Sequence, residues 1–130
     1  MSEEQQQLNP YELIGGDEGV KELSTKFYDY METLDEAKDI LDLHPKDLAT
    51  ARSKFFMFLS GWLGGPQRYM AAFGHPRLRS RHLPFAIGDK ERDQWLMCMQ
   101  MALDSMQLDT AFKTHLMSSF TQVANHMRNQ

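Results

Sequence analysis

Apolar residues at helical spacing, broken by glycine and proline, are the feature that most constrains the fold of this 130-residue chain. The segment before the Gly64-Gly65-Pro66 break follows the i, i+3, i+4, i+7, i+8 rule of a helix with one apolar face. Its stripe is made of Phe55, Phe58, Leu59, Trp62 and Leu63. Similar stripes lie within residues 20–31, 95–106 and 112–127, and no alternating strand pattern accompanies them. We therefore predict an all-α fold of five or six helices of very unequal length.

Capping and breaking residues predict where these helices begin and end. Asp17 and Asp89 can cap the helices that follow them, and Asp109-Thr110 opens the last one. The mixed segment 33–47 contains a corner at His44-Pro45, because proline disfavours helical geometry in the residue before it.

The stretch that follows the glycine pair is predicted to leave the regular helical pattern. Residues 67–75 are expected to form an extended connection with Tyr69 as an anchor. A very short helix can begin at Pro76 and must end before Pro84, because proline is tolerated in the first turn of a helix but not in its interior. This places His82 in the last turn of that helix.

Composition and charge narrow the setting in which the chain works. Its 14 basic residues against 18 acidic ones argue against a nucleic-acid partner, and no apolar run is long enough to cross a membrane. The polar start MSEEQQQLNP is no secretory signal, and a single cysteine suits a reducing compartment, so we expect a cytoplasmic protein. We expect residues 1–10 to be a flexible tail and 11–130 a single domain.

The 10 methionines indicate either a cavity with adaptable walls or simply a methionine-rich core. Motifs of other chemistries are absent: the sequence has no HExxH, no CxxC and no GxSxG. Cys98 is expected to be a small buried apolar residue.

Among the 5 histidines, His82 has the surroundings that an axial haem ligand needs. A helix end offers free carbonyls for one ring nitrogen, and Leu83, Phe85 and Ile87 offer an apolar wall. The alternative is an ordinary histidine that the helix dipole favours at a C-terminus.

Arginines surround His82 in an otherwise acidic chain, at positions 77, 79 and 81. Such a cluster suits a local anion, and the two carboxylates at a haem edge would pair with it well. A solvated basic turn and a short nucleic-acid patch are the alternatives.

The stretch GHPRLRSRHLPFAI, preceded by FLSGWLGGP and followed by ERDQWLMCM, resembles the truncated haemoglobins, specifically group II of that family. The resemblance covers about residues 11–127 and is densest over 58–98. It implies a truncated globin-like two-over-two helical sandwich around haem b, which is iron protoporphyrin IX.

The resemblance also implies roles for single residues. His82 matches the proximal histidine that binds the iron, and Arg81 and Tyr69 fall where the family contacts the haem propionates. Tyr28 and Trp95 match residues that stabilise a bound ligand by hydrogen bonding. The further haem contacts that we expect are Phe55, Phe58, Leu59, Arg79, Phe85 and Ile87.

The other side of the expected pocket departs from the commoner pattern of the family. Ala51 stands at the usual distal-histidine site, so no histidine gate is expected and an entry could stay open. Phe55 follows one turn later, and His44 occupies the corner position. We expect His44 to be a third hydrogen-bond donor to the ligand, and it could also reach the iron.

These features predict a bacterial-type haem protein that reversibly binds oxygen and other diatomic ligands such as NO and CO. The alternative is an enzyme that consumes peroxide or nitric oxide with an external electron donor. A helical interaction module without haem is a third possibility. We expect a monomer or a weak homodimer.

Overall fold

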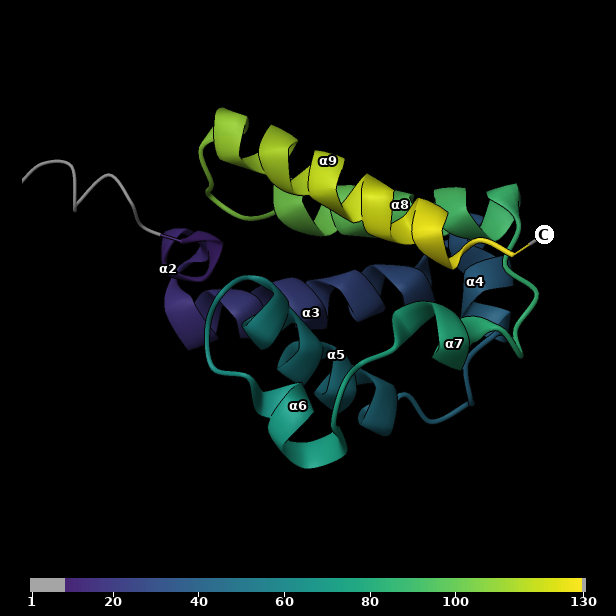
Figure 1. Cartoon of the computed structure of the whole chain (residues 1–130). Coiled ribbons are helices and arrows are strands. Elements are labelled where there is room, and N and C mark those ends of the chain that lie inside the picture. Colours follow the sequence, from purple (N-terminus) through teal and green to yellow (C-terminus); the bar gives the residue numbers. More distant parts are fainter. Residues whose placement is uncertain (1–8, 130) are drawn as a thin grey trace, which may run out of the picture.

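The computed structural model describes residues 9–129, apart from the side chains of Arg79 and Arg81, and this part of the chain contains helices and no strand (Figure 1). The elements in chain order are α2 (Pro10–Ile14), α3 (Gly16–Thr33), the 3-10 helix η1 (Asp35–Ala37), α4 (Lys38–Asp42), α5 (Ala49–Trp62), α6 (Arg68–Phe73), α7 (Leu78–His82), α8 (Asp89–Asp104) and α9 (Thr110–Met127). The all-α prediction is confirmed, with more short helices than expected. No helix within these residues combines the length and apolar character needed to cross a bilayer.

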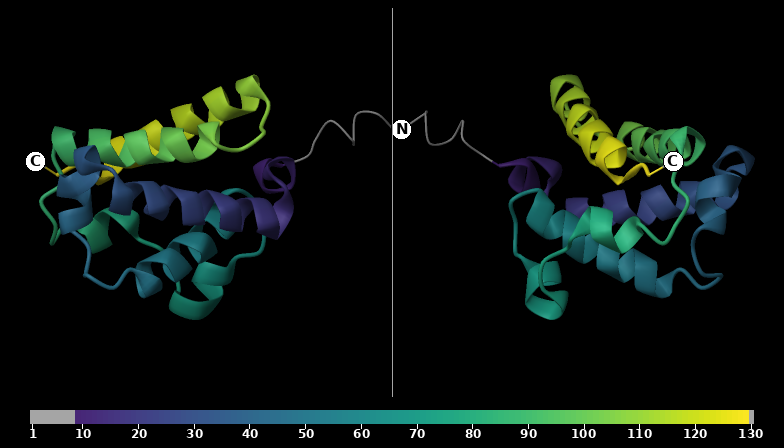
Figure 2. Two further views of the ribbon diagram at one scale, coloured as in Figure 1. Left: turned by 180° about the vertical axis from the view of Figure 1, so that it is seen from behind. Right: turned by 45° about the vertical axis from the view of Figure 1, so that its right-hand side comes forward.

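The long helices form two facing pairs. Helices α8 and α9 pack together above α3 and α5, and α3 touches both its own partner α5 and the opposing α8 (Figures 1 and 2). This is the predicted two-over-two sandwich. The short helices pack at different edges of this sandwich: α4 against α3 and α8, α6 against α5, and α7 against α9 (Figure 1).

Side chains from the inner faces of the four long helices α3, α5, α8 and α9 fill the core. Their helical spacing turns one stripe of each helix inward, as the sequence pattern predicts. The fully enclosed members include Val20, Leu23, Phe27, Met31, Cys98, Met99, Leu103, Leu116 and Phe120. Burial raises the pKa of the Cys98 thiol to about 11, so this cysteine is a neutral apolar residue, as expected.

Three of the predicted helix starts are wrong. Helix α7 begins at Leu78 and not at Pro76. Helix α3 begins at Gly16, with Gly15 in the left-handed region (φ 112°) at its cap, so Asp17 already lies in the first turn. Helix α8 is capped by Gly88, whose N–H donates to the Glu91 carboxylate at 2.9 Å. The predicted cap at Asp109 is confirmed, because its carboxylate accepts from two backbone N–H groups of α9. The tail predicted for residues 1–10 lies mostly outside the described residues, and helix α2 already begins at Pro10.

The predicted extended connection over 67–75 is also wrong, because residues 68–73 form helix α6. Arg68 at its start makes two hydrogen bonds to the Asp17 carboxylate, at 2.8 and 2.7 Å, and a third to Ser60 Oγ at 2.8 Å. These bonds attach α6 to α3 and α5. Asp17 therefore binds Arg68 and does not cap α3.

The glycine break after α5 is needed for close packing. A Cβ atom on Gly65 would collide with ring carbons of Tyr11, whose hydroxyl donates to Asp17 at 2.5 Å. The same small network therefore fixes both α2 and the turn that follows α5.

We expect Gly65→Ala to lower the free energy of unfolding by about 1–3 kcal/mol, because the new methyl group collides with the Tyr11 ring. Urea unfolding of the variant measures this loss. In a Tyr11→Ala background the same substitution should cost much less, since the colliding ring is gone. An equal cost in both backgrounds would contradict the steric explanation.

Candidate functional site

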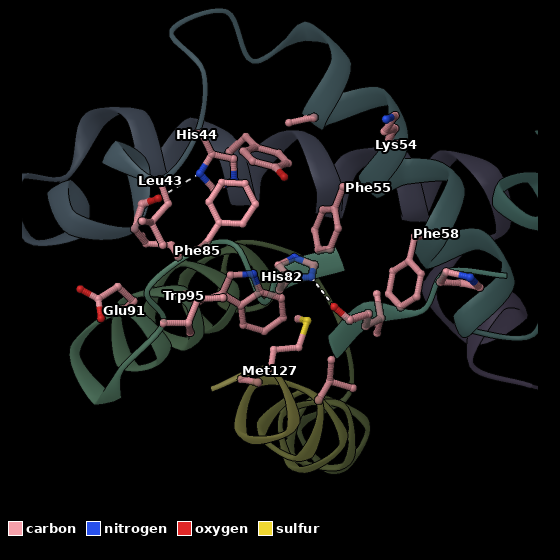
Figure 3. A pocket seen from close by; sticks show the side chains of 18 of the residues that line it. Leu43, His44, Lys54, Phe55, Phe58, His82, Phe85, Glu91, Trp95 and Met127 are labelled. Carbon is pink, nitrogen blue, oxygen red and sulfur yellow. Dashed lines mark hydrogen bonds between the residues drawn. The ribbon is translucent and has the colours of Figure 1, made fainter. Parts of the chain in front are cut away.

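A cavity of about 570 Å³ opens between the two helix pairs, within the range of cofactor and ligand pockets. Its walls come from α3, α4, α5, α6, α7, α8 and α9 and are mainly apolar (Figure 3). The predicted site residues that line it are Tyr28, His44, Phe55, Phe58, Tyr69, His82, Phe85, Ile87 and Trp95. Residues separated by almost 70 positions in the sequence thus face one space.

His82 lies at the C-terminal end of α7, as predicted, and its ring faces the cavity. Its Nδ1 lies 2.6 Å from the carbonyl oxygen of Leu78, one turn earlier. A carbonyl only accepts, so Nδ1 of the neutral ring carries the proton and Nε2 keeps its lone pair. That is the form in which an imidazole binds a metal.

Tyr28 of α3 and Trp95 of α8 bring hydrogen-bond donors to the wall of the cavity. Both rings pack on the enclosed ring of Phe27, with centroids 5.0 and 5.3 Å away. Within residues 9–129, neither the Tyr28 hydroxyl nor the Trp95 indole N–H has a protein acceptor. Burial raises the pKa of Tyr28 above its ordinary value, so the hydroxyl keeps its proton. Two donors are therefore available to a molecule in the cavity.

His44 lies beside Tyr28, with ring centroids 5.8 Å apart in an edge-to-face arrangement. Its Nδ1 lies 2.9 Å from the carbonyl oxygen of Ile40 and donates to it in the neutral ring. Burial lowers the pKa of His44, with a smaller contribution from His82, so the neutral form is favoured. In that form Nε2 can only accept. His44 can therefore donate to a ligand only when its ring is protonated, which limits the donor role that we expected for it.

Ala51 also lines the cavity, at the N-terminal part of α5. A methyl group leaves this side of the cavity open where a larger side chain would close it. Lys54 lines the cavity one turn further along, and its ammonium group lies 4.9 Å from the centre of the Phe73 ring. The lining of the cavity therefore includes a cation that the sequence reasoning missed.

Three other predicted contacts stand apart from these. Leu59 is fully enclosed in the core and is not among the residues that line the cavity. Arg79 and Arg81 belong to α7, but their side chains lie outside the described residues.

Sequence reasoning also missed the contribution of α9. Val123, Ala124 and Met127 line the cavity from this helix, together with Phe120. Their spacing was interpreted as an ordinary core stripe. Leu116 of that stripe is buried in the core, whereas Phe120, Val123 and Met127 line the cavity. Helical periodicity alone does not reveal this difference.

The residues of the cavity fit a flat apolar cofactor with one metal. His82 offers an unprotonated nitrogen on one side, aromatic and aliphatic side chains offer the faces, and Tyr28 and Trp95 offer donors. Comparison with known proteins agrees with this chemistry. A family model described as bacterial-like globin matches residues 9–129.

The group 2 truncated haemoglobin YjbI of Bacillus subtilis is 39% identical over 121 residues, covering 93% of this chain and 89% of that protein. The cold-adapted truncated haemoglobin of Pseudoalteromonas haloplanktis has a TM-score of 0.92 at 46% identity, covering 95% of this chain and 99% of that one. A group II 2-on-2 haemoglobin from Agrobacterium tumefaciens gives 0.91 at 41% identity, with 95% of both chains covered.

The chain belongs to the bacterial-like globin family, and its likeness to group II truncated haemoglobins confirms the resemblance found in the sequence. Globins are haem proteins that bind small ligands, and the described cavity accommodates that function.

The lowered pKa of His44 predicts a pH effect on stability. Between its folded pKa and its ordinary value of 6.5, the unfolded chain binds more protons, so the stability present above that range is lost as the pH falls through it. We expect His44→Gln to lose less stability than the parent chain between about pH 7.5 and pH 5, measured by urea unfolding. His115→Gln, at an exposed position of α9, is the control and should behave like the parent.

Proposed function

We propose that this chain binds haem b in the cavity through His82 and reversibly binds oxygen and other diatomic ligands there. The observation that carries the proposal is that three side chains from three helices line one mainly apolar cavity. His82 keeps a lone pair on Nε2, and Tyr28 and Trp95 bring hydrogen-bond donors that no described residue accepts. When bound, haem supplies an iron with one free coordination position for a small ligand.

His82 is proposed to hold the iron. Its hydrogen bond to the Leu78 carbonyl fixes both the tautomer and the orientation of the ring, and it makes Nε2 a better electron donor. Leu78, Phe85 and Ile87 line the cavity on the same segment of the chain and offer an apolar wall.

Tyr28 and Trp95 are proposed to retain the ligand. Each can donate one hydrogen bond, worth about 1 kcal/mol net and more in a dry pocket. Two such bonds together would slow ligand release by about tenfold to a hundredfold. Tyr69, Arg79 and Arg81 are proposed to pair with the haem carboxylates at the edge next to α6 and α7.

The setting in which the protein works is also proposed. We expect a cytoplasmic monomer or weak homodimer that receives electrons from an external donor. Oxygen is the ligand that we propose first, and NO and CO would compete for the same position.

We expect His82→Gly to lose the spectrum of a five-coordinate ferrous haem protein, because the proposed histidine ligand of the iron would then be missing. Absorbance spectra of the purified ferrous protein measure this. Added imidazole should restore the spectrum in the variant, while His75→Gly, outside the cavity lining, should leave it unchanged. A normal spectrum in His82→Gly without imidazole would exclude this residue as the ligand.

We expect Tyr28→Phe and Trp95→Phe each to speed oxygen dissociation by roughly fivefold to tenfold, because each removes one donor and keeps most of the packing. Stopped-flow measurement of the dissociation rate tests this, with the double variant beside the two single ones. Rates equal to that of the parent would show that these donors do not reach the ligand.

Consumption of peroxide is a second candidate, and the state of His44 favours it. A neutral imidazole whose Nε2 accepts can take a proton from a peroxide molecule in the cavity, which is the work of a general base. Steady-state turnover with peroxide and a reductant distinguishes this activity from simple gas binding. Turnover that is unaffected by His44→Phe would argue against this role of His44.

A further inference from the structure

The C-terminal segment that follows α9 is hydrogen-bonded to the loop that follows His82. Asn129 donates through Nδ2 to the carbonyl oxygens of Phe85, at 2.8 Å, and of His82 itself, at 3.3 Å. Its Oδ1 accepts from the N–H of Ile87 at 3.0 Å. Its backbone N–H donates to the Ile87 carbonyl at 2.8 Å. One residue therefore satisfies four backbone groups of a single loop.

This loop has little other support. Helix α7 has only 5 residues, and its principal contact with another helix is with α9. A helix this short is not stable without tertiary contacts. Leu83 and Phe85, which follow it, are 55% and 43% exposed. The position of the His82 backbone therefore depends heavily on the end of α9.

The neighbouring residue holds the same segment from another direction. Arg128 forms an ion pair with Asp89 at the start of α8. Residues 128 and 129 thus connect the end of α9 with both the loop after α7 and the helix that the loop enters. The carbonyl of His82 is one of the free groups that a helix end leaves, and Asn129 supplies one of its donors.

We infer that Asn129 is a positioning residue for His82: it fixes the backbone of the axial ligand and thereby sets the iron–histidine bond and the retention of haem. The inference rests on the proposed haem function. It assigns Asn129 no contact with haem or ligand. Its effect passes through the carbonyls of His82 and Phe85 and through both backbone groups of Ile87.

Two substitutions separate the bonds that Asn129 donates to carbonyl groups from the bond that it accepts from the Ile87 N–H. Asn129→Asp keeps an acceptor for the Ile87 N–H but replaces the donor to the carbonyls of His82 and Phe85 with an oxygen that they repel. Asn129→Ala removes all three side-chain bonds. Asn125→Ala is the matched control, since this amide lies one turn earlier and accepts from Arg92 at 3.0 Å, away from the loop.

The test uses the haem-loaded protein and two readouts. We expect the iron–histidine stretching band in the resonance Raman spectrum of the unliganded ferrous protein to shift or broaden in both Asn129 variants. We expect haem loss to an acceptor apoprotein to accelerate about tenfold, the scale of one or two net hydrogen bonds. Asn125→Ala should leave both unchanged, and circular dichroism checks that every variant keeps its helices.

A band and a haem-loss rate equal to those of the parent in the Asn129 variants would overturn the inference while leaving the proposed function intact. Equal changes in Asn125→Ala would overturn it too, since they would show a general effect of loosening the end of α9. If Asn129→Ala fails to fold, Asn129→Asp still decides, because it keeps the bond to Ile87. Absence of any haem spectrum in the parent chain would instead refute the proposed function itself.

Discussion

The packing of the Phe27 ring is the interaction on which the rest of the site depends. This side chain of α3 is only 1% exposed, and its ring centroid lies 5.0, 4.9 and 5.3 Å from those of Tyr28, Phe55 and Trp95. The three partners come from three helices, and all of them line the cavity. Because a close-packed interior lets no ring move alone, Phe27 fixes the direction in which the donors of Tyr28 and Trp95 point. The core, not a loop, therefore determines the part of the cavity wall that Tyr28 and Trp95 form.

The two histidines of the cavity are positioned by the same local device. His44 and His82 each follow or end a 5-residue helix, and each directs Nδ1 to the backbone carbonyl four residues earlier. A proline comes soon after each of them, which prevents the helix from continuing. In both cases the backbone bond fixes the tautomer and leaves the lone pair on Nε2. A short, interrupted helix is therefore a way to present an unprotonated imidazole.

The sequence predicted the elements whose evidence is local and missed those that depend on distant partners. The apolar stripe of α5 and the helix-end position of His82 follow from spacing and proline alone, and both are observed. Helix α6 is too short for its periodicity to be recognised. Its first residue, Arg68, is held by Asp17, 51 positions away. A stripe also does not reveal which part of an apolar face meets core and which part meets cavity, and Leu59 lies in the core outside the cavity lining.

The short helices next to His44 and His82 need support from outside, and amide side chains supply part of it at both. Gln94 accepts from the Ile40 N–H at 2.9 Å and donates to Asp39 at 2.8 Å, which attaches α4 to α8 beside Trp95. Asn129 does the corresponding work for α7. An amide suits this task because it donates and accepts at once. Gln94 and Asn129 thus link the segments that carry the two imidazoles to the longer helices or their ends, so the geometry of the cavity is coupled to the α8–α9 layer of the sandwich.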